Sequence, residues 1–206
     1  MNIIEFELET WYTFCIRFNW LALMVAAVVI VIVGLILKKL SLKLARHSIN
    51  VDEVSLGIGQ SNIKLTYNKK DQEIAYKLWV ELNTRKIGLA FDEDYDVIIE
   101  VYNSWYDFFK IARELLKDVP PSLFSYSTEL ITVTTDVLNK GLRPHLTKWQ
   151  AKYRKWYEEK SKDSRSPQEI QRTFPEYDEL LSDLLATNKR MIEYKNLMFH
   201  IAFDKK

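Results

Sequence analysis

The sequence holds little of what several protein classes require. A single cysteine, Cys15, excludes an internal disulfide framework and a cysteine-rich zinc site. Five prolines and five glycines among 206 residues exclude collagen-like and low-complexity chains, and they are too few for a many-turned β-sandwich. An excess of one charge is also missing: 29 Lys and Arg against 28 Asp and Glu leave a net charge of +1, which gives no general attraction to nucleic acids.

One long stretch of the sequence carries no charge. Residues 18–37 are bounded by Arg17 and Lys38, and residues 21–37 contain only aliphatic side chains, Met, Ala and Gly. A bilayer core of about 30 Å requires about 20 such residues in a helix. A buried helix of a soluble protein usually keeps a polar stripe, and this stretch has none. The sequence therefore predicts a transmembrane helix over residues 18–37.

The charges that flank this stretch predict its orientation. Three glutamates precede it, the reverse of a cleaved signal peptide, so we expect an uncleaved anchor. Cations follow it, and they set topology by remaining in the cytoplasm or recruit anionic lipid head groups: Lys38, Lys39, Lys43 and Arg46. We expect residues 1–17 outside, a basic linker at residues 38–48 and a cytoplasmic domain at residues 49–206, in a protein of the inner (cytoplasmic) membrane.

Aromatic residues mark the predicted outer end of the spanning helix. Trp11, Tyr12 and Trp20 have amphipathic rings, which favour the membrane interface. Residues 3–14 are apolar at many positions, and we expect them to form a short interfacial helix or an extension of the spanning helix.

The cytoplasmic part is predicted to begin with a short β-hairpin. Residues 51–58 and 63–67 read as strand-like runs, and the second alternates strictly between apolar and polar residues. Gly57 and Gly59 lie between the runs and supply turn-forming residues. A hairpin alone is marginally stable in water, so we expect it to pack on other elements.

Helical periodicity follows the hairpin. Apolar residues recur at spacings of three and four in four segments. These segments predict helices over about residues 71–86, 92–119, 122–160 with an interruption at Gly141 and Pro144, and from 176 onward. Four helices with short links are typical of an antiparallel bundle, so the predicted fold class is mainly α. The aromatic segment at residues 102–109 is expected to be its central helix, and its outer rings are the alternative site for a subunit contact.

Few residues suggest catalysis or metal binding. The three histidines are scattered without the spacing of a metal site, and no nucleophile elbow, phosphate loop or paired-acid motif is present. The acidic run at residues 92–96 begins like a calcium loop, but Val97 and Asn103 stand where that loop needs Gly and Glu. We expect these carboxylates to cap a helix N-terminus instead. No catalytic residue, metal or cofactor is therefore predicted.

Two groups of residues are candidates for a binding surface. Trp79, Arg85 and Lys86 could form an anion or nucleotide pocket, although Arg85 is more simply explained as an ion-pair partner of Glu81. The second group mixes cations with aromatic rings and comprises Arg143, His145, Lys148, Trp149, Lys152, Arg154 and Trp156. Such mixtures bind single-stranded nucleic acid or membrane surfaces. The simpler interpretation, which we prefer, is an apolar stripe with solvated cations opposite it.

The order of these segments resembles that of known bacterial proteins. Together with residues 79–86 (WVELNTRK) and residues 96–106 (DVIIEVYNSWY), it is similar to small, single-pass, membrane-anchored bacterial proteins of uncharacterised type. Some of those proteins accompany antiphage defence systems and act as membrane effectors. The resemblance is architectural, covers most of the chain and implies no catalytic residue.

The leading hypothesis is a non-enzymatic inner-membrane protein whose helical domain binds a partner or signal. Its expected partners are the lipid bilayer and either a protein or further copies of the chain, and the resemblance implies a membrane-acting defence effector. One alternative is a passive tether or scaffold. Another is a membrane-bound nuclease or nucleotide-binding domain that uses Arg85, His145 and Lys148, with nucleic acid as a less favoured partner.

Overall fold

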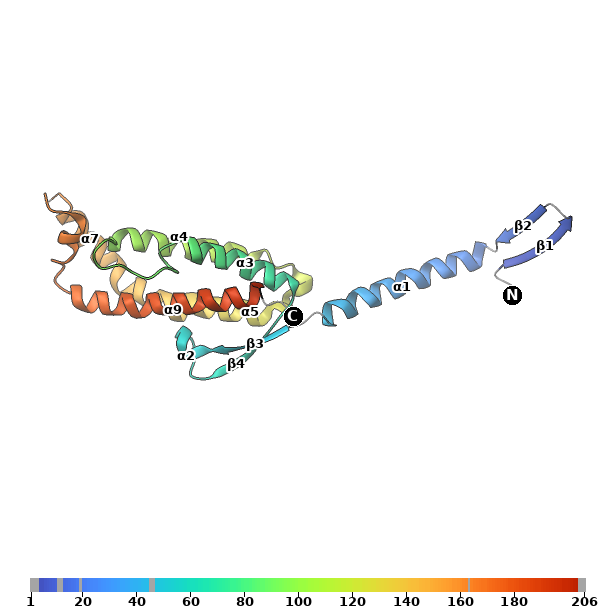
Figure 1. Cartoon of the computed structure of the whole chain (residues 1–206), viewed down its shortest axis with the longest axis horizontal. Helices are drawn as coiled ribbons and strands as arrows, with labels where there is room; N and C mark the ends of the chain where they lie inside the picture. The colour runs from blue at the N-terminus through green and yellow to red at the C-terminus, as the bar shows by residue number, and fades with distance from the viewer. Residues whose placement is uncertain (1–3, 11–12, 19, 45–46, 163, 204–206) are drawn as a thin grey trace. The chain divides into compact units, whose positions relative to one another are not determined.

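The chain consists of two units that are mainly helical. The computed structural model describes residues 4–10, 13–18, 20–44, 47–162 and 164–203, and for residues 4–18 and 40–44 it describes the backbone alone. The units are Met1–Ala45 and Arg46–Lys206, and Figure 1 shows their elements. Helices account for most of the described residues, which confirms the mainly α fold class.

The first unit begins with a β-hairpin. Strands β1 (Ile4–Thr10) and β2 (Thr13–Phe18) pair antiparallel, with Phe6 opposite Ile16. The expectation of an interfacial helix in this segment is therefore wrong. Residues 4–9 alternate between apolar and acidic, which is the two-residue period of a strand and not the 3.6-residue period of a helix.

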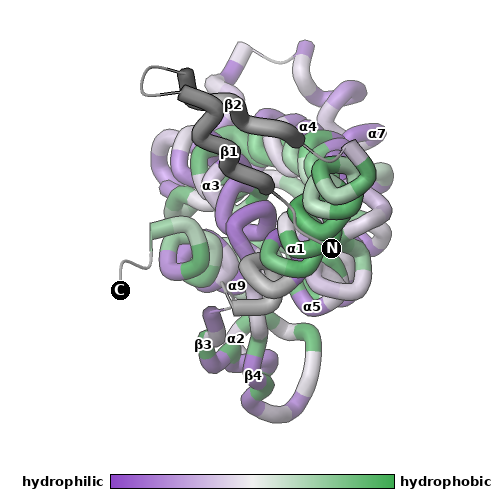
Figure 2. Tube along the Cα trace, turned by 90° about the vertical axis from the view of Figure 1, so that its right-hand side faces the viewer, coloured by the Kyte–Doolittle hydropathy of each residue, from purple (hydrophilic) through white to green (hydrophobic). Residues whose placement is uncertain are grey.

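Helix α1 (Trp20–Leu44) contains most of the predicted transmembrane segment. Its part from Trp20 to Lys39 is long and apolar enough to cross a membrane, and Figure 2 shows its hydrophobic turns. At 1.5 Å per residue this part rises about 30 Å, the thickness of the hydrocarbon core of a bilayer. Its side chains are exposed along the whole length, for example 70% for Ile30.

The predicted basic linker at residues 38–48 overlaps the end of α1. Lys38 and Lys39 are exposed residues of this helix, and its backbone continues through Lys43. Leu and Lys, which fill these turns, are good helix formers. The next strand already begins at His47. Three other residues predicted to act at the membrane lie outside the described residues: Trp11, Tyr12 and Arg46.

The second unit begins with the predicted β-hairpin, which carries one helical turn in its loop. Val54 and Leu56 belong to this turn and not to the first strand. The strand ends early because the Asp52 carboxylate accepts a hydrogen bond from the Val54 N–H (3.0 Å) and caps the turn. Gly57 ends the turn with a φ of +68°, which glycine adopts without strain. The three elements are β3 (His47–Asp52), α2 (Glu53–Leu56) and β4 (Asn62–Tyr67), with β3 and β4 antiparallel.

Packed helices make up the rest of the second unit (Figure 1). The two that pack most extensively, α3 and α9, run in opposite directions, since Tyr76 contacts Phe203 whereas Gly88, just beyond α3, accepts a hydrogen bond from Lys195. Large aromatic side chains of α4, α7 and α9 are buried among these helices. The α-helices are α3 (Lys69–Thr84), α4 (Ile98–Lys117), α5 (Phe124–Asp136), α6 (Arg143–His145), α7 (Ala151–Lys160), α8 (Pro167–Gln171) and α9 (Tyr177–Phe203).

One helical run extends from the 3₁₀ turn at Pro121–Leu123 to Lys160, so the predicted interruption at Gly141 and Pro144 is wrong. Two π-helical turns, η2 (Val137–Leu142) and η3 (Leu146–Gln150), flank α6 within this run. Pro144 lacks an N–H, and its ring would clash with a carbonyl of a regular α-helix. The wider π-helical turns re-route the backbone hydrogen bonds around the proline, and the helix continues.

Helix α4 begins at Ile98, six residues after its predicted start at Asp92. Its first N–H donates to the side-chain oxygen of Gln171 on α8 (3.0 Å), and the Gln171 amide donates to the carbonyl of Asp96 (3.0 Å). Gln171 is fully buried. The cap therefore comes from a glutamine far along the chain, and the expectation that the acidic run caps this helix is wrong.

Asn68 joins the start of α3 to α5. Its side-chain oxygen accepts hydrogen bonds from the backbone N–H groups of Lys70 (2.8 Å) and Asp71 (3.2 Å). The carboxylate of Asp71 in turn accepts a hydrogen bond from the Asn68 N–H. Its amide nitrogen donates to Ser127 Oγ (3.2 Å) and to the carbonyl of Tyr126 (3.3 Å). Asn68 is therefore both a helix cap and a buried link between elements.

We expect Asn68→Ala to lower the free energy of unfolding by about 2–3 kcal/mol. A lost cap contributes about 1 kcal/mol, and the buried groups left without a partner contribute about 1–2 kcal/mol more. Ser166→Ala removes the same type of cap from the start of α8, where Ser166 itself is exposed, and should cost about 1 kcal/mol. Denaturant unfolding of the full chain in mild detergent, followed by tryptophan fluorescence, measures both losses. Equal losses would contradict the role of Asn68 as a buried link.

Candidate functional site

A buried histidine links three helical segments. His145 lies in α6, between the two π-helical turns, and is 2% exposed. Its Nδ1 lies 2.8 Å from Asp183 Oδ2 on α9, and its Nε2 lies 3.1 Å from the hydroxyl of Tyr102 on α4. Asp183 also accepts a hydrogen bond from Trp149 Nε1 (2.9 Å). These four groups form one hydrogen-bonded chain that runs from the buried Tyr102 to the partly exposed Asp183.

The contacts of His145 favour its neutral form. An ionised carboxylate can only accept, so Nδ1 carries the proton and Nε2 accepts from the Tyr102 O–H. Burial lowers the pKa of His145 below its usual 6.5, although the hydrogen bond to Asp183 opposes this shift. Burial acts to raise the pKa of Asp183, but hydrogen bonds from His145 and Trp149 bring it below its usual 3.8. A neutral imidazole thus meets an ionised carboxylate at neutral pH.

This chain of groups is closed to a substrate. His145 and Tyr102 are buried, and the rings of Trp105 and Tyr102 pack against the imidazole at 5.4 and 5.7 Å. Burial also raises the pKa of Tyr102, so its hydroxyl stays protonated. The arrangement satisfies buried polar groups and fixes how α4, α6 and α9 pack.

The residues that follow His145 dock the helical run onto α9. Lys148 Nζ lies 2.8 Å from the carboxylate of Glu179, and Lys152 forms an ion pair with Glu176. Trp149 is 1% exposed and lies between them in sequence. His145 and Trp149 therefore belong to the core. For Trp149 this agrees with the preferred interpretation of an apolar stripe, and the alternative that placed both residues on an exposed surface is wrong. The charges of the two lysines are matched by Glu179 in the first turn of α9 and by Glu176 directly before that helix.

The other members of the second predicted group point elsewhere. Arg143 and Arg154 line depressions between the helical run and α4. The half-buried Trp156 packs edge-on against Phe174 (5.1 Å between ring centroids) and against Tyr153 (5.8 Å). The structure thus divides the predicted group into a face toward α9 and a face toward α4.

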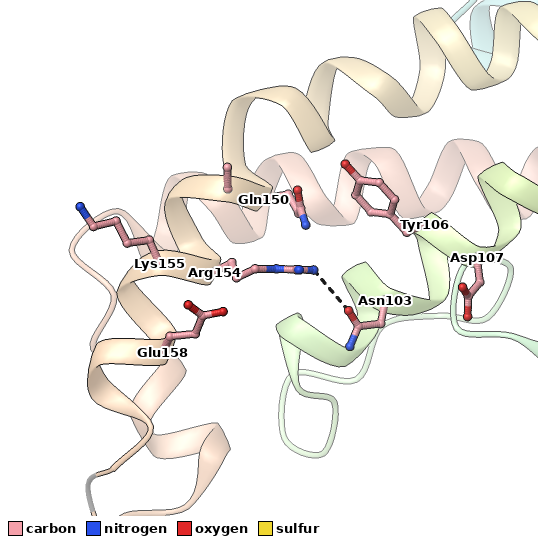
Figure 3. A pocket seen from close by; sticks show the side chains of 8 residues that line it. Asn103, Tyr106, Asp107, Gln150, Arg154, Lys155 and Glu158 are labelled. Atoms are coloured by element: carbon pink, nitrogen blue, oxygen red, sulfur yellow. Dashed lines mark hydrogen bonds between the residues drawn. The ribbon is translucent and has the colours of Figure 1, made fainter.

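A groove of about 690 Å³ lies between α4 and α7. Figure 3 shows its side chains, with Arg154 extending toward Asn103 Oδ1 in a long hydrogen bond of 3.4 Å. The Nε of Arg154 is buried and has no hydrogen-bond partner. The lining residues are Asn103, Tyr106 and Asp107 from α4, and Gln150, Ala151, Arg154, Lys155 and Glu158 from the helical run.

The groove continues past Tyr106 toward a cluster of cations. The guanidinium of Arg143 lies 4.8 Å from the centroid of the Phe109 ring, and that of Arg113 lies 5.6 Å from it. Lys110 lines the same depression of about 340 Å³. We call Phe109, Lys110, Arg113 and Arg143 the Phe109 cluster. Tyr106, which is 51% exposed, lines both ends of the groove, so not every ring of the aromatic segment at residues 102–109 lies in the core.

The first predicted group, Trp79, Arg85 and Lys86, does not form one pocket. Arg85 pairs with Glu81, as the simpler interpretation expected. It also lies 3.6 Å from Asp107 and so links α3 to α4, a contact that was not predicted. Lys86 pairs with Asp96 at 2.8 Å. Trp79 instead belongs to an aromatic cluster on α3 and α9 that comprises Tyr76, Trp79, Phe199 and Phe203.

The residues proposed for a nuclease are occupied in separate contacts. Arg85 pairs with acids of α3 and α4, His145 is buried, and Lys148 pairs with Glu179. These partners belong to different helices of the packed unit. The geometry therefore gives no support to a joint catalytic role for the three residues.

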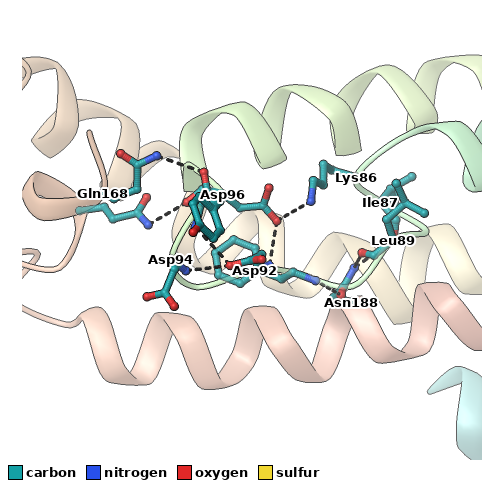
Figure 4. Close-up of polar contacts among 11 residues, drawn as sticks. Lys86, Ile87, Leu89, Asp92, Asp94, Asp96, Gln168 and Asn188 are labelled. Carbon is teal, nitrogen blue, oxygen red and sulfur yellow. Dashed lines mark hydrogen bonds and ion pairs between the residues drawn. The ribbon is translucent and has the colours of Figure 1, made fainter. Parts of the chain in front are cut away.

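The acidic run forms a hydrogen-bonded turn (Figure 4). Asp92 Oδ1 accepts from the backbone of Asp94 (3.0 Å), and Asp96 Oδ2 accepts from the Asp92 N–H and from Lys86 (both 2.8 Å). Asn188 of α9 holds the preceding residues through the carbonyls of Ile87 and Leu89. Within the described parts of the chain, no group of three or more His, Cys, Asp and Glu could hold a metal ion.

Sequence reasoning missed the residues that organise the site. Tyr102, Asp183, Gln171 and Asn188 act through partners 34 to 101 residues away, which no local pattern reveals. For Asp183 the sequence does contain one indication of a buried contact: it lies three residues after Leu180 and beside the apolar stripe of α9. For the Phe109 cluster the sequence also contains an indication, because Phe109 and Arg113 are four residues apart and therefore neighbours on one helix face.

We expect the free energy of unfolding to fall as the pH drops from about 7 to 5. His145 has a lowered pKa when folded and about 6.5 when unfolded, so the unfolded chain binds the proton first. Below pH 6.5 the slope approaches about 1.4 kcal/mol per pH unit for one proton. Denaturant unfolding of the full chain in detergent at a series of pH values measures this slope of the unfolding free energy. The lowered pKa of Asp183 acts only at more acidic pH.

Two histidine variants isolate this effect. His145→Gln should remove the slope between pH 7 and 5, whereas His200→Gln, which changes an exposed residue, should keep it. An identical slope in the wild type and in His145→Gln would show that His145 is not the group responsible.

Comparison of the chain with models of known protein families, with curated proteins and with solved structures found no match. Proposals about its function therefore rest on the contacts, charges and exposure of its own residues. The features that bear on function are the exposed apolar surface of α1 and the groove beside α4.

Proposed function

We propose that the protein is a single-pass protein of the inner membrane that holds a helical binding domain at its cytoplasmic face. In this proposal residues 1–17 lie outside, α1 spans the bilayer and the packed helices form an antiparallel bundle in the cytoplasm. The groove between α4 and the helical run is the place where the domain binds a partner or signal.

The exposed apolar surface of α1 is the observation that carries this proposal. Side chains from Trp20 to Leu37 are aliphatic or aromatic apart from Met24 and Gly34, and nearly all of them are exposed. A continuous apolar surface of this size is strongly unfavourable in water and favourable in hydrocarbon. Its length of about 30 Å matches one crossing of a bilayer.

The cations at one end of α1 support the orientation. Lys38 and Lys39 are exposed at the C-terminal end of the apolar stretch, and two further cations follow in the sequence. One arginine precedes the stretch. Because the more basic flank of a membrane helix remains in the cytoplasm, we place the helical domain there.

A binding role fits the spanning helix better than pore formation. A pathway for ions needs polar side chains inside the membrane. Residues 21–37 contain no charged, hydroxyl or amide side chain. We therefore propose a tethered binding domain, and a membrane-permeabilising effector would have to open the bilayer through other parts of the chain.

Two arginines in the centre of α1 should prevent membrane insertion. Each costs about 3 kcal/mol at the bilayer midplane, so Val29→Arg with Ile30→Arg removes about 6 kcal/mol of insertion free energy. The chain is expressed in bacteria, extracted with alkaline carbonate and floated on a density gradient. We expect the wild type to float with membranes and the double variant to remain at the bottom.

A matched variant and a protease assay complete this test. Val29→Leu with Ile30→Leu alters the same positions and should float like the wild type. Proteinase K added to intact spheroplasts should leave the helical domain whole and digest it only after lysis. A wild type released by carbonate would refute the anchor, and digestion without lysis would refute the orientation.

A further inference from the structure

We propose that the groove binds a phosphorylated small molecule with at least two negative charges, whose phosphate lies in the Phe109 cluster and whose planar ring lies against Tyr106. This inference rests on the proposed binding role of the groove and names the class of ligand. It is independent of the side of the membrane on which the domain lies.

Three cations of the Phe109 cluster lack a carboxylate partner. Among the described residues, no acid lies within 4.0 Å of the side-chain nitrogens of Lys110, Arg113 or Arg143. Many other cations of the second unit do have such a partner, and they include Lys77, Lys117, Lys140, Lys148 and Lys152. The groove thus gathers positive charge that no direct ion pair among the described residues neutralises, and Glu114 attracts Arg113 and Lys110 only at longer range.

The nearby acids are engaged by other cations. Asp107 is the one acidic residue that lines this end of the groove, and it faces Arg85 at 3.6 Å. Glu114 follows Arg113 on α4 and pairs with Lys117 at 2.7 Å. Like charges held close together repel, so an anion placed among the three cations would be bound favourably.

The geometry of the two arginines suits a phosphate. Both guanidinium groups are held at the ring of Phe109, which orients them and reduces the entropy lost on binding. Arg143 uses its Nε on Asn139 Oδ1 (3.1 Å), which leaves its terminal nitrogens as donors. A guanidinium fork matches two phosphate oxygens, and Lys110 adds a point charge.

The rest of the groove suits a planar polar group. Tyr106 lies between its two ends and offers an exposed ring face, and the amides of Asn103 and Gln150 offer both donors and acceptors. From Asn103 to Arg113 the helix rises about 15 Å, the length of a ring joined to a phosphate chain. A volume of about 690 Å³ lies within the range of ligand pockets.

Arg154 marks the far end of the groove as a second polar contact. Its Nε is buried without a hydrogen-bond partner, and its terminal nitrogen makes only a long bond to Asn103. A buried unsatisfied donor is costly, and a ligand acceptor would satisfy it. The donors at both ends therefore favour a ligand with an anionic end and a polar ring end.

Calorimetry with the full chain in phosphatidylcholine nanodiscs tests this proposal. The probes are inorganic phosphate, pyrophosphate and adenosine triphosphate. We expect affinity to rise in that order and to weaken with salt, because charge provides much of the binding. Arg143→Gln should weaken pyrophosphate binding about tenfold or more, as expected for the loss of a charged hydrogen bond.

Matched variants separate the cluster from general charge. Lys140→Gln removes the same charge from the adjoining π-helical turn η2, but Lys140 already pairs with Asp136, so affinity should change less than about twofold. Tyr106→Ala should weaken adenosine triphosphate about fivefold or more and leave pyrophosphate unchanged, because only the nucleotide has a ring to stack.

Nanodiscs that contain anionic phospholipid distinguish a soluble ligand from a lipid head group. Competition by this lipid that disappears in Arg143→Gln would assign the same phosphate site to a lipid. Absence of probe binding in both kinds of nanodisc, or equal losses in Arg143→Gln and Lys140→Gln, would overturn the proposal. Binding can also be measured in detergent, so failure of the site and failure of the membrane anchor give different results.

Discussion

The hydrogen bonds of His145 are the interaction on which the packing of the helical unit depends. A neutral imidazole offers one donor and one acceptor on opposite sides of a ring, and here each meets a partner from a different helix. Asp183 extends the contact to Trp149. Because these groups are buried, a side chain without both functions would leave at least one of them unsatisfied. The angle and register of three helical segments therefore follow from one ring.

The π-helical turns on either side of His145 explain how one helical run serves two neighbours. Lys148 and Lys152 pair with carboxylates in the first turn of α9 and directly before it, while Arg143 and Arg154 line depressions beside α4. Each π-helical turn places residues at angles that a regular helix would not reach. The internal face holds the fold together, and the other face keeps its cations available. Stability and proposed binding are thus separated on one element.

Local signals in the sequence predicted the elements better than their contacts. The apolar stretch predicted α1, the alternation around Leu65 predicted β4, and helical periodicity predicted α3, α4 and α9. The first hairpin was missed because its acidic alternation was read as an interfacial helix. The continuous run through Pro144 was missed because π-helical turns have no simple sequence signature. Of the candidate site, Arg143 and Arg154 were predicted, and Tyr106 lies in the segment whose outer rings were the alternative site for a subunit contact. Lys110 and Arg113 were not predicted, since their role depends on α4 facing the helical run.

The length of η3 has a consequence for how this unit can vary among related sequences. A π-helical turn holds one residue more than an α-helical turn, so removal of any one residue from Leu146–Gln150 could leave an unbroken helix. Because the wide turn takes up that extra residue, the later residues would keep nearly the same directions around the helix axis. A deletion within α7, a regular helix, would instead turn every later residue of the helix by about 100°. Single-residue deletions should therefore be tolerated better in η3 than in α7.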